Sequence, residues 1–92
     1  MDSTKCLAYK IEFQRQPYKF LKKLKDNELK LRIKKGIYDI PKDPYKKTKK
    51  LQGLPQTIRR IRIGKYRIIF EIDELDCIII IHEIGLRANV YS

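Results

Sequence analysis

The sequence has little of what several protein classes require. It contains no tryptophan, one histidine and two cysteines in 92 residues. Its longest uninterrupted apolar run, Cys77–Ile81, is far shorter than the roughly 18 residues of a membrane-spanning helix. Charged residues interrupt positions 1–15, so no secretory signal is predicted. We therefore expect a cytoplasmic protein that does not enter a membrane.

The two cysteines are too few for a disulfide scaffold. Cys6 and Cys77 have neither a C-x-x-C spacing nor a second histidine with which to bind a metal. Because disulfides are scarce in the cytosol, the sequence predicts that both are reduced packing residues. A chain this short buries only about 60 to 65% of the surface that its unfolded form exposes, which argues against a deep cofactor pocket. One domain over residues 1–92, without a cofactor, is expected.

Acidic residues are also scarce. There are 11 Asp and Glu against 22 Lys and Arg, which gives a formal net charge of +11. Residues 1–70 hold 21 of the basic and 6 of the acidic residues, whereas residues 71–92 hold 1 basic and 5 acidic. A strongly basic segment in a small protein indicates an anionic partner, either nucleic acid or an acidic protein that mimics it.

Hydrophobic periodicity predicts a strand and two helices in the first half. Apolar residues alternate over positions 7–13, as in a half-buried strand. Pro17 suits the first turn of the next helix, and Asn27 is the predicted N-cap of a second helix. A lysine-rich loop over Pro41–Gln56 follows. The apolar positions are Leu7, Tyr9, Ile11 and Phe13 in the strand, Phe20, Leu21 and Leu24 in the first helix, and Leu29, Ile33, Ile37 and Ile40 in the second.

The second half consists of β-branched runs separated by turn residues. Thr57–Ile63, Lys65–Ile72 and Cys77–Ile84 are predicted to form a three-stranded antiparallel meander. The missing alternation in Ile78–Ile81 predicts a central strand covered on both faces. The fold class is therefore α+β, in the order βααβββ, with the N-terminal strand and the helical hairpin packed on an antiparallel sheet and a short C-terminal segment at the end.

Arginines gather on one face of this predicted sheet. The period of two places Arg60 and Arg62 on one face and Arg59 on the other. Arg67 joins the first face if the hairpin register allows it. Since guanidinium groups match phosphate oxygens bidentately and stay charged, these three arginines are a candidate phosphate clamp. The alternative is a solvated basic sheet face.

The remaining titratable residues suggest no further site. His82 lies in an apolar run beside Glu83, and neighbouring strand residues point to opposite faces, so it is predicted to be a structural histidine. Consecutive turn residues give no convergent ligands, so the acidic turn is predicted to be a hairpin rim and no metal is expected. The rim comprises Glu71, Asp73, Glu74 and Asp76.

Four segments together resemble the RelE toxins of the RelE/ParE superfamily. The pattern R-x-R-x-G-x-Y-R over positions 60–67 and the later G-x-R-x-x-V-Y over positions 85–91 are the most specific parts of the resemblance. The full set is Leu51–Pro55, Arg60–Ile72, Ile84–Arg87 and Val90–Tyr91. The resemblance implies a RelE-like fold and a toxin of a type II toxin–antitoxin system. Such a toxin is a metal-independent endoribonuclease that enters the ribosomal A site and cuts messenger RNA through the 2′-hydroxyl of the RNA itself.

The resemblance also implies site residues and partners. The arginines would neutralise the phosphate, and the C-terminal tyrosine would stack on a base or help to move a proton. A RelB-like antitoxin is the expected protein partner, and the ribosome and messenger RNA are the other partners. The catalytic residues carried over are Arg60, Arg62, Arg67, Arg87 and Tyr91, and the expected ribosome-binding residues are Lys46, Lys47, Lys49 and Lys50.

Two departures leave alternatives open. RelE-like toxins often carry lysines where this chain has Arg60 and Arg62, so the resemblance assigns no general base. Gln52 stands where some members carry a basic residue. A ParE-like toxin that inhibits DNA gyrase without nuclease activity, and a non-catalytic basic RNA-binding module, are the competing hypotheses.

Overall fold

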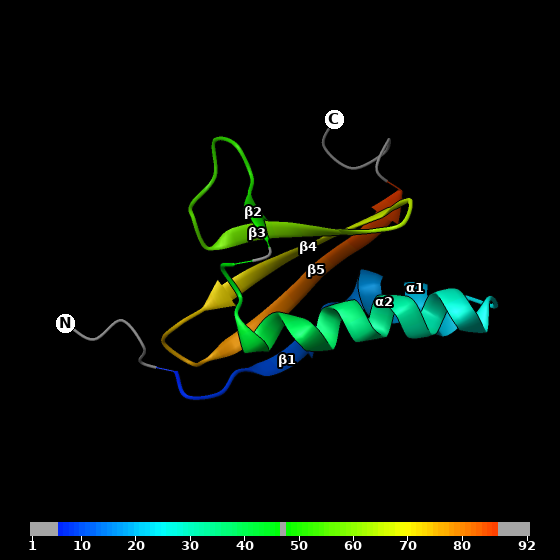
Figure 1. Cartoon of the computed structure of the whole chain (residues 1–92), viewed down its shortest axis with the longest axis horizontal. Coiled ribbons are helices and arrows are strands. Elements are labelled where there is room, and N and C mark those ends of the chain that lie inside the picture. The colour runs from blue at the N-terminus through cyan, green and yellow to red at the C-terminus, as the bar shows by residue number, and fades with distance from the viewer. Residues whose placement is uncertain (1–5, 47, 87–92) are drawn as a thin grey trace.

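A computed structural model describes residues 6–46 and 48–86 of the chain. The elements follow in the order β-α-α-η-β-β-β-β, with the helices near the beginning and a meander at the end (Figure 1). They are β1 (Lys10–Phe13), α1 (Arg15–Lys23), α2 (Asn27–Asp39), the 3-10 helix η1 (Ile40–Lys42), β2 (Lys49–Lys50), β3 (Ile58–Ile63), β4 (Tyr66–Asp73) and β5 (Ile78–Leu86).

One five-stranded mixed sheet forms the centre of the fold. Its strand order is β1-β5-β4-β3-β2, and β2 through β5 pair antiparallel, which confirms the predicted meander. The α+β class is also confirmed, but the sheet is not purely antiparallel, because β1 pairs with β5 in the parallel direction. β1 is shorter than predicted, and Leu7 is 99% exposed. The two-residue strand β2 within the lysine-rich loop was not predicted.

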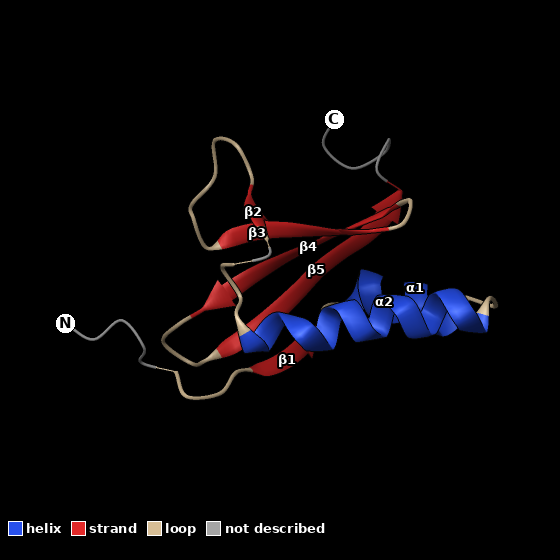
Figure 2. Cartoon of the chain, in the orientation of Figure 1, coloured by secondary structure: helices blue, strands red, loops and turns tan. Residues whose placement is uncertain are grey.

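The two helices cover one face of the sheet (Figure 2). The main core joins helix residues such as Ile33 and Ile37 to alternate residues of β4 and β5, among them Phe70 and Ile79. On the opposite, outer face, Leu51 and Ile69 form a small buried apolar cluster. The prediction that β5 is covered on both faces is wrong. Ile79 and Ile81 are buried under the helices, whereas Ile78 and Ile80 on the outer face are only half-buried.

Local signals explain where α2 begins and how closely it packs. Asp26, one residue before the predicted cap Asn27, is the N-cap, and its Oδ1 accepts a hydrogen bond from the backbone N–H of Leu29 at 3.1 Å. Gly36 faces β3, where a Cβ atom would lie 2.2 Å from Cδ1 of Ile63. A glycine therefore lets the helix approach the sheet closely at this point. None of the helices in the described part of the chain is long and apolar enough to span a membrane.

The prediction that both cysteines are reduced is wrong, because Cys6 and Cys77 form a disulfide across 71 residues of sequence. The parallel pairing explains their proximity: Lys10 lies beside Ile78, and its backbone N–H donates to the carbonyl of Cys77 at 2.9 Å. The segment before β1 is thereby held next to the turn between β4 and β5.

Candidate functional site

Three of the predicted arginines lie on the outer face of the sheet. Arg62 of β3 is directly opposite Arg67 of β4, and Arg60 is opposite Ile69. Directly opposite residues of an antiparallel pair project to the same face, about 5 Å apart at Cβ. The two-residue turn at Gly64 and Lys65, with φ +59° at the glycine, sets this register. The hairpin thus brings the three arginines to one face.

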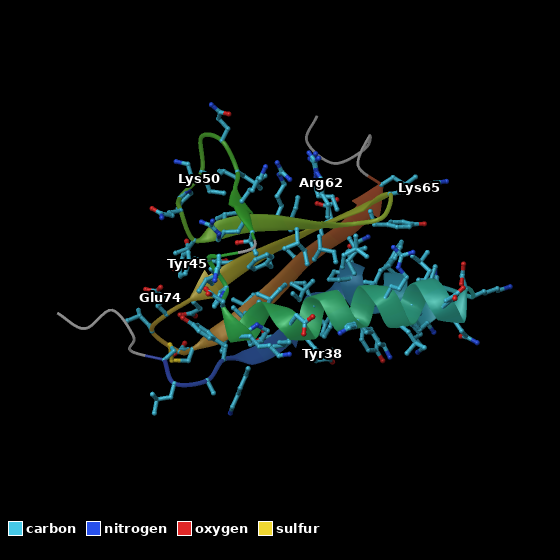
Figure 3. All side chains as sticks on the ribbon, viewed as in Figure 1. Tyr38, Tyr45, Lys50, Arg62, Lys65 and Glu74 are labelled. Carbon is cyan, nitrogen blue, oxygen red and sulfur yellow. A yellow bond between two sulfur atoms is a disulfide. The ribbon has the colours of Figure 1, made fainter. Side chains whose placement is uncertain are left out.

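The three side chains differ in how far they reach into solvent. Arg62 is exposed and points away from the helices in Figure 3, Arg60 is half-buried, and Arg67 is only 7% exposed. Arg67 therefore lies at the base of this cationic patch, while Arg60 and Arg62 reach further into solvent and would contact a ligand first.

The lysine-rich loop adds a further cation to the same face. Lys49 of β2 is directly opposite Arg60, so the outer face carries two cross-strand pairs of like charge, Lys49–Arg60 and Arg62–Arg67. Four cationic residues on one face of a sheet raise the local positive potential, which attracts a phosphate-bearing ligand.

The other predicted lysines do not all share this face. Lys50 is opposite Arg59 and so belongs to the helix-side face, although it is exposed at the sheet edge. Lys46 is exposed in the turn before β2. Lys47 lies outside the described residues, as do two of the predicted catalytic residues, Arg87 and Tyr91.

Arg59 positions the loop that carries these lysines. Its guanidinium is buried, and it donates from Nε to Oγ1 of Thr48 at 2.6 Å and from Nη2 to the Thr48 carbonyl at 2.9 Å. Further donations go to the carbonyls of Gln56 at 3.0 Å and Tyr45 at 3.3 Å. The hydroxyl of Thr48 in turn donates to the Pro44 carbonyl at 2.7 Å. One arginine side chain therefore fixes the path of the loop on both sides of β2.

Tyr45 ties the same loop to the turn between β4 and β5. Its hydroxyl donates to Oε2 of Glu74 at 2.5 Å, and its ring lies 5.1 Å from the Arg59 guanidinium. Burial, and then the hydrogen bond to Glu74, raise the pKa of Tyr45 to about 12. Burial and the charge of Glu74 also raise the pKa of Tyr9 above its ordinary value. In Figure 3, Tyr45 and Glu74 lie together at the end of the sheet away from Lys65.

His82, which the sequence predicts to be a structural histidine, is exposed on the outer face of the sheet and has a hydrogen-bond partner there. A register irregularity between Ile69 and Phe70 on β4 places His82 in a β-bulge, between Ile81, which pairs with Phe70, and Glu83, which pairs with Ile69. Its Nε2 lies 2.9 Å from Oε1 of Glu71, and both side chains are more than a third exposed. The sequence interpretation weighed His82 only against its neighbour Glu83 and missed Glu71, because that pairing depends on the register of β5 with β4.

The acidic turn is held by local hydrogen bonds. Oδ1 of Asp73 accepts from the backbone N–H groups of Leu75 at 3.0 Å and Asp76 at 3.1 Å. Across residues 6–46 and 48–86, no three His, Cys, Asp or Glu side chains gather in a way that could hold a metal ion.

A basic groove runs between α1 and α2 on the opposite side of the molecule. It has a volume of about 410 Å³, and lysines and tyrosines line it without any carboxylate. Tyr38, at its α2 side, points away from the sheet in Figure 3. The lining residues are Phe13, Tyr18, Leu21, Lys22, Lys30, Lys34 and Tyr38.

Comparison with known proteins agrees with this architecture. The family model for the ParE toxin of type II toxin–antitoxin systems, parDE, matches residues 11–91. The chain belongs to this toxin family. Membership of the RelE/ParE superfamily, predicted from the sequence motifs, is thereby confirmed, and the protein is a toxin of a type II toxin–antitoxin system. No curated protein sequence matches the chain significantly.

Solved structures of RelE-like toxins show the same fold. The isolated RelE toxin of Escherichia coli is 22% identical, with a TM-score of 0.74 over 86% of this chain and 84% of that one. A chain of the RelBE2 toxin–antitoxin complex of Mycobacterium tuberculosis is 21% identical, with a TM-score of 0.75 over 88% and 100%. A chain of the RelE–RelB complex of Pyrococcus horikoshii is 23% identical, with a TM-score of 0.71 over 89% and 98%. The predicted RelE-like fold is confirmed.

Proposed function

We propose that this toxin is an endoribonuclease that cleaves messenger RNA in the ribosomal A site, with the 2′-hydroxyl of the RNA as nucleophile. The observation that supports the proposal is the set of four cationic residues that the strand register places on the outer face, Lys49, Arg60, Arg62 and Arg67. These residues lie on neighbouring strands of one continuous sheet, so a single RNA backbone segment can contact Lys49, Arg60 and Arg62, with Arg67 beneath them.

The chemistry assigned to the arginines is electrostatic. Cleavage gathers negative charge on the phosphate as the 2′-oxygen attacks and the 5′-oxygen leaves. Guanidinium groups fixed by the hairpin register are oriented before the reaction, so they stabilise that charge with little reorganisation. Arg67 is buried, so its guanidinium is largely shielded from water and acts from a fixed position. Arg60 and Arg62 are more exposed, and their side chains can move toward the phosphate as it binds. Arg87 and Tyr91 complete the proposed site by their match to the RelE motif.

Ribosomal RNA is the proposed docking surface for the lysines. Lys46 and Lys50 are exposed on the loop held by Arg59, and they extend the basic surface beyond the arginines. Contacts of lysine with the phosphate backbone position a protein without reading sequence, and their affinity falls steeply with salt. Residue Lys47 belongs to the same proposed set through its place in the loop.

The proposed protein partner is an acidic, RelB-like antitoxin. Structures of the RelE relatives named above include complexes with RelB antitoxins. The groove between α1 and α2 has three lysines and two tyrosines among its lining residues, which is the charge and shape that an acidic amphipathic segment complements.

A second candidate is inhibition of DNA gyrase, because the family model that matches describes ParE toxins. This function requires no RNA cleavage. It predicts trapped, cleaved plasmid and intact message, whereas the endoribonuclease predicts the reverse.

The deciding experiment is translation of a defined message in a reconstituted mixture, with and without ribosomes, followed by primer extension. We expect cleavage within ribosome-occupied codons and none without ribosomes. Arg62→Ala should reduce the cleavage rate at least about 100-fold, as loss of one transition-state donor does. Arg15→Ala, at an exposed arginine of α1, is the matched control and should retain the rate. Message that stays intact on decoding ribosomes overturns the proposal.

A further inference from the structure

We propose that His82 is the residue that takes the proton from the attacking 2′-hydroxyl, and that Glu71 positions its ring. This inference rests on the proposed function, because it assigns the proton transfer that the arginines of the same face cannot perform. The observation behind it is a histidine–carboxylate pair, 2.9 Å between Nε2 of His82 and Oε1 of Glu71, on a partly exposed sheet surface.

Strand alternation presents this pair on the outer face. His82 comes two residues after the half-buried Ile80, which is opposite Glu71, so His82 and Glu71 lie diagonally across β5 and β4 on that face. The bulge beside His82 lets Glu83, which is opposite Ile69, face the same side and returns Ile84 to the core. Bulges are common beside active sites.

The hydrogen bond to Glu71 also selects the protonation form of the ring. A carboxylate only accepts hydrogen bonds, so Nε2 carries the proton and donates it, and the lone pair is left on Nδ1. Glu71 is the one hydrogen-bond partner of this imidazole among the described residues. Because 39% of the His82 side chain is exposed, a ligand that lies on the sheet can approach the imidazole ring.

The pair lies beside the cationic patch rather than within it. Arg60 is opposite Ile69, and Ile69 is opposite Glu83, the neighbour of His82. The β3 and β5 backbones are therefore two strand spacings, about 10 Å, apart. Arginine and histidine side chains are long enough to reach a phosphodiester bound between these two strands from opposite sides. The charged groups around His82 are Glu71 on β4, Glu83 on β5, Arg60 on β3 and Glu12, opposite Ile80, on β1.

The proposed step balances as follows. Nδ1 of His82 accepts the proton of the 2′-hydroxyl while the 2′-oxygen forms a bond to phosphorus. The bond from phosphorus to the 5′-oxygen breaks, and that oxygen takes a proton from water. The imidazolium then returns its proton to water, so the products are a 2′,3′-cyclic phosphate and a 5′-hydroxyl end. During the step Glu71 stabilises the imidazolium, and the arginines stabilise the phosphate.

The test measures single-turnover cleavage of message on programmed ribosomes across the pH range of histidine titration. We expect His82→Gln to slow cleavage at least about 100-fold and to leave ribosome binding unchanged. The rise of the wild-type rate with pH that follows histidine deprotonation, the histidine limb of the pH profile, should be absent from this variant. Added imidazole should restore part of the rate in His82→Ala. Glu71→Gln should slow cleavage and shift that limb, whereas Glu28→Gln, the same change at an exposed glutamate of α2, should do neither.

The outcomes separate this inference from the proposed function. Wild-type toxin that leaves message intact overturns the function itself. Wild-type cleavage together with an unchanged rate and pH profile in His82→Gln overturns the role of His82 and leaves the function standing. A slow His82→Gln variant that keeps the histidine limb and gains nothing from imidazole also overturns it, because that result describes a structural residue.

Discussion

The hydroxyl of Tyr45 donates a 2.5 Å hydrogen bond to the carboxylate of Glu74, so the lysine-rich loop is fastened to the turn between β4 and β5. The same turn is followed by Cys77, whose disulfide to Cys6 holds the segment before β1. Arg59 fastens the loop a second time, through the carbonyls of Tyr45 and Thr48. The basic loop therefore has two attachments, the Tyr45–Glu74 hydrogen bond and the Arg59 hydrogen bonds. A substitution can remove either one and leave the outer-face arginines in place.

Removal of the Tyr45 hydroxyl should change how stability depends on pH. Unfolded tyrosine loses its proton near pH 10, but in the folded protein the pKa of Tyr45 is about 12. Its contribution to the free energy of unfolding is thus fully present below pH 10 and is lost as the pH rises toward 12. Tyr45→Phe should be about 1 kcal/mol less stable at neutral pH, and this deficit should shrink over that alkaline interval.

Urea unfolding at a series of pH values measures this effect. Tyr38→Phe, at an exposed tyrosine of α2, is the matched control, and we expect no such deficit from it. A constant difference between wild type and Tyr45→Phe from neutral pH to pH 12 would contradict the assignment of the proton to Tyr45.

Arg59 should matter for folding more than its neighbour on the same strand. Arg59→Met removes four donated hydrogen bonds and leaves the carbonyls of Tyr45, Thr48 and Gln56 without this donor. We expect a loss of about 2 to 4 kcal/mol in the free energy of unfolding. Arg60→Met, on the outer face, should lose less than about 1 kcal/mol. Equal losses in the two variants would show that the loop does not depend on the Arg59 network.

The sequence was sufficient for the features that depend on local periodicity. Buried Ile33 and Ile37 follow from helical spacing, and the two-residue turn at Gly64 sets the register of β3 with β4. The parallel pairing of Lys10 with Ile78 joins residues from opposite ends of the chain, and no local pattern encodes it. The disulfide depends on that pairing, which is why the cysteines were predicted to be reduced.

The candidate site shows the same limit. The face shared by Arg60 and Arg62 follows from alternation along one strand, and Arg67 follows once the hairpin register is known. The approach of His82 to Glu71 depends on the register of β5 with β4, and the bulge beside His82 brings Glu83 to the same face, against the predicted alternation. Alternation along single strands therefore placed the arginines but did not reveal the partner of the histidine.

Reduction of the disulfide should destabilise the fold. Cys6 and Cys77 close a loop of 71 residues, and opening such a loop restores entropy to the unfolded chain. Dithiothreitol should lower the free energy of unfolding by about 2 to 4 kcal/mol. Cys6→Ser should start at that lower value and not respond to the reductant. Two free thiols in the untreated protein by thiol titration, with no effect of dithiothreitol on unfolding, would refute the prediction.

Lys49 and Lys35 differ in the surface on which they lie, and this difference tests the proposed RNA contact. Lys49 is directly opposite Arg60 on the outer face, whereas Lys35 is exposed on α2. Each lysine that contacts a phosphate releases counterions, so its loss lowers the slope of log affinity against log salt concentration by about 1. Lys49→Gln should therefore weaken ribosome binding at low salt and flatten the salt dependence, and Lys35→Gln should change both less. The measurement is equilibrium binding to programmed ribosomes at several salt concentrations. If the two variants keep the wild-type slope, the RNA backbone does not lie across the Lys49–Arg60 pair.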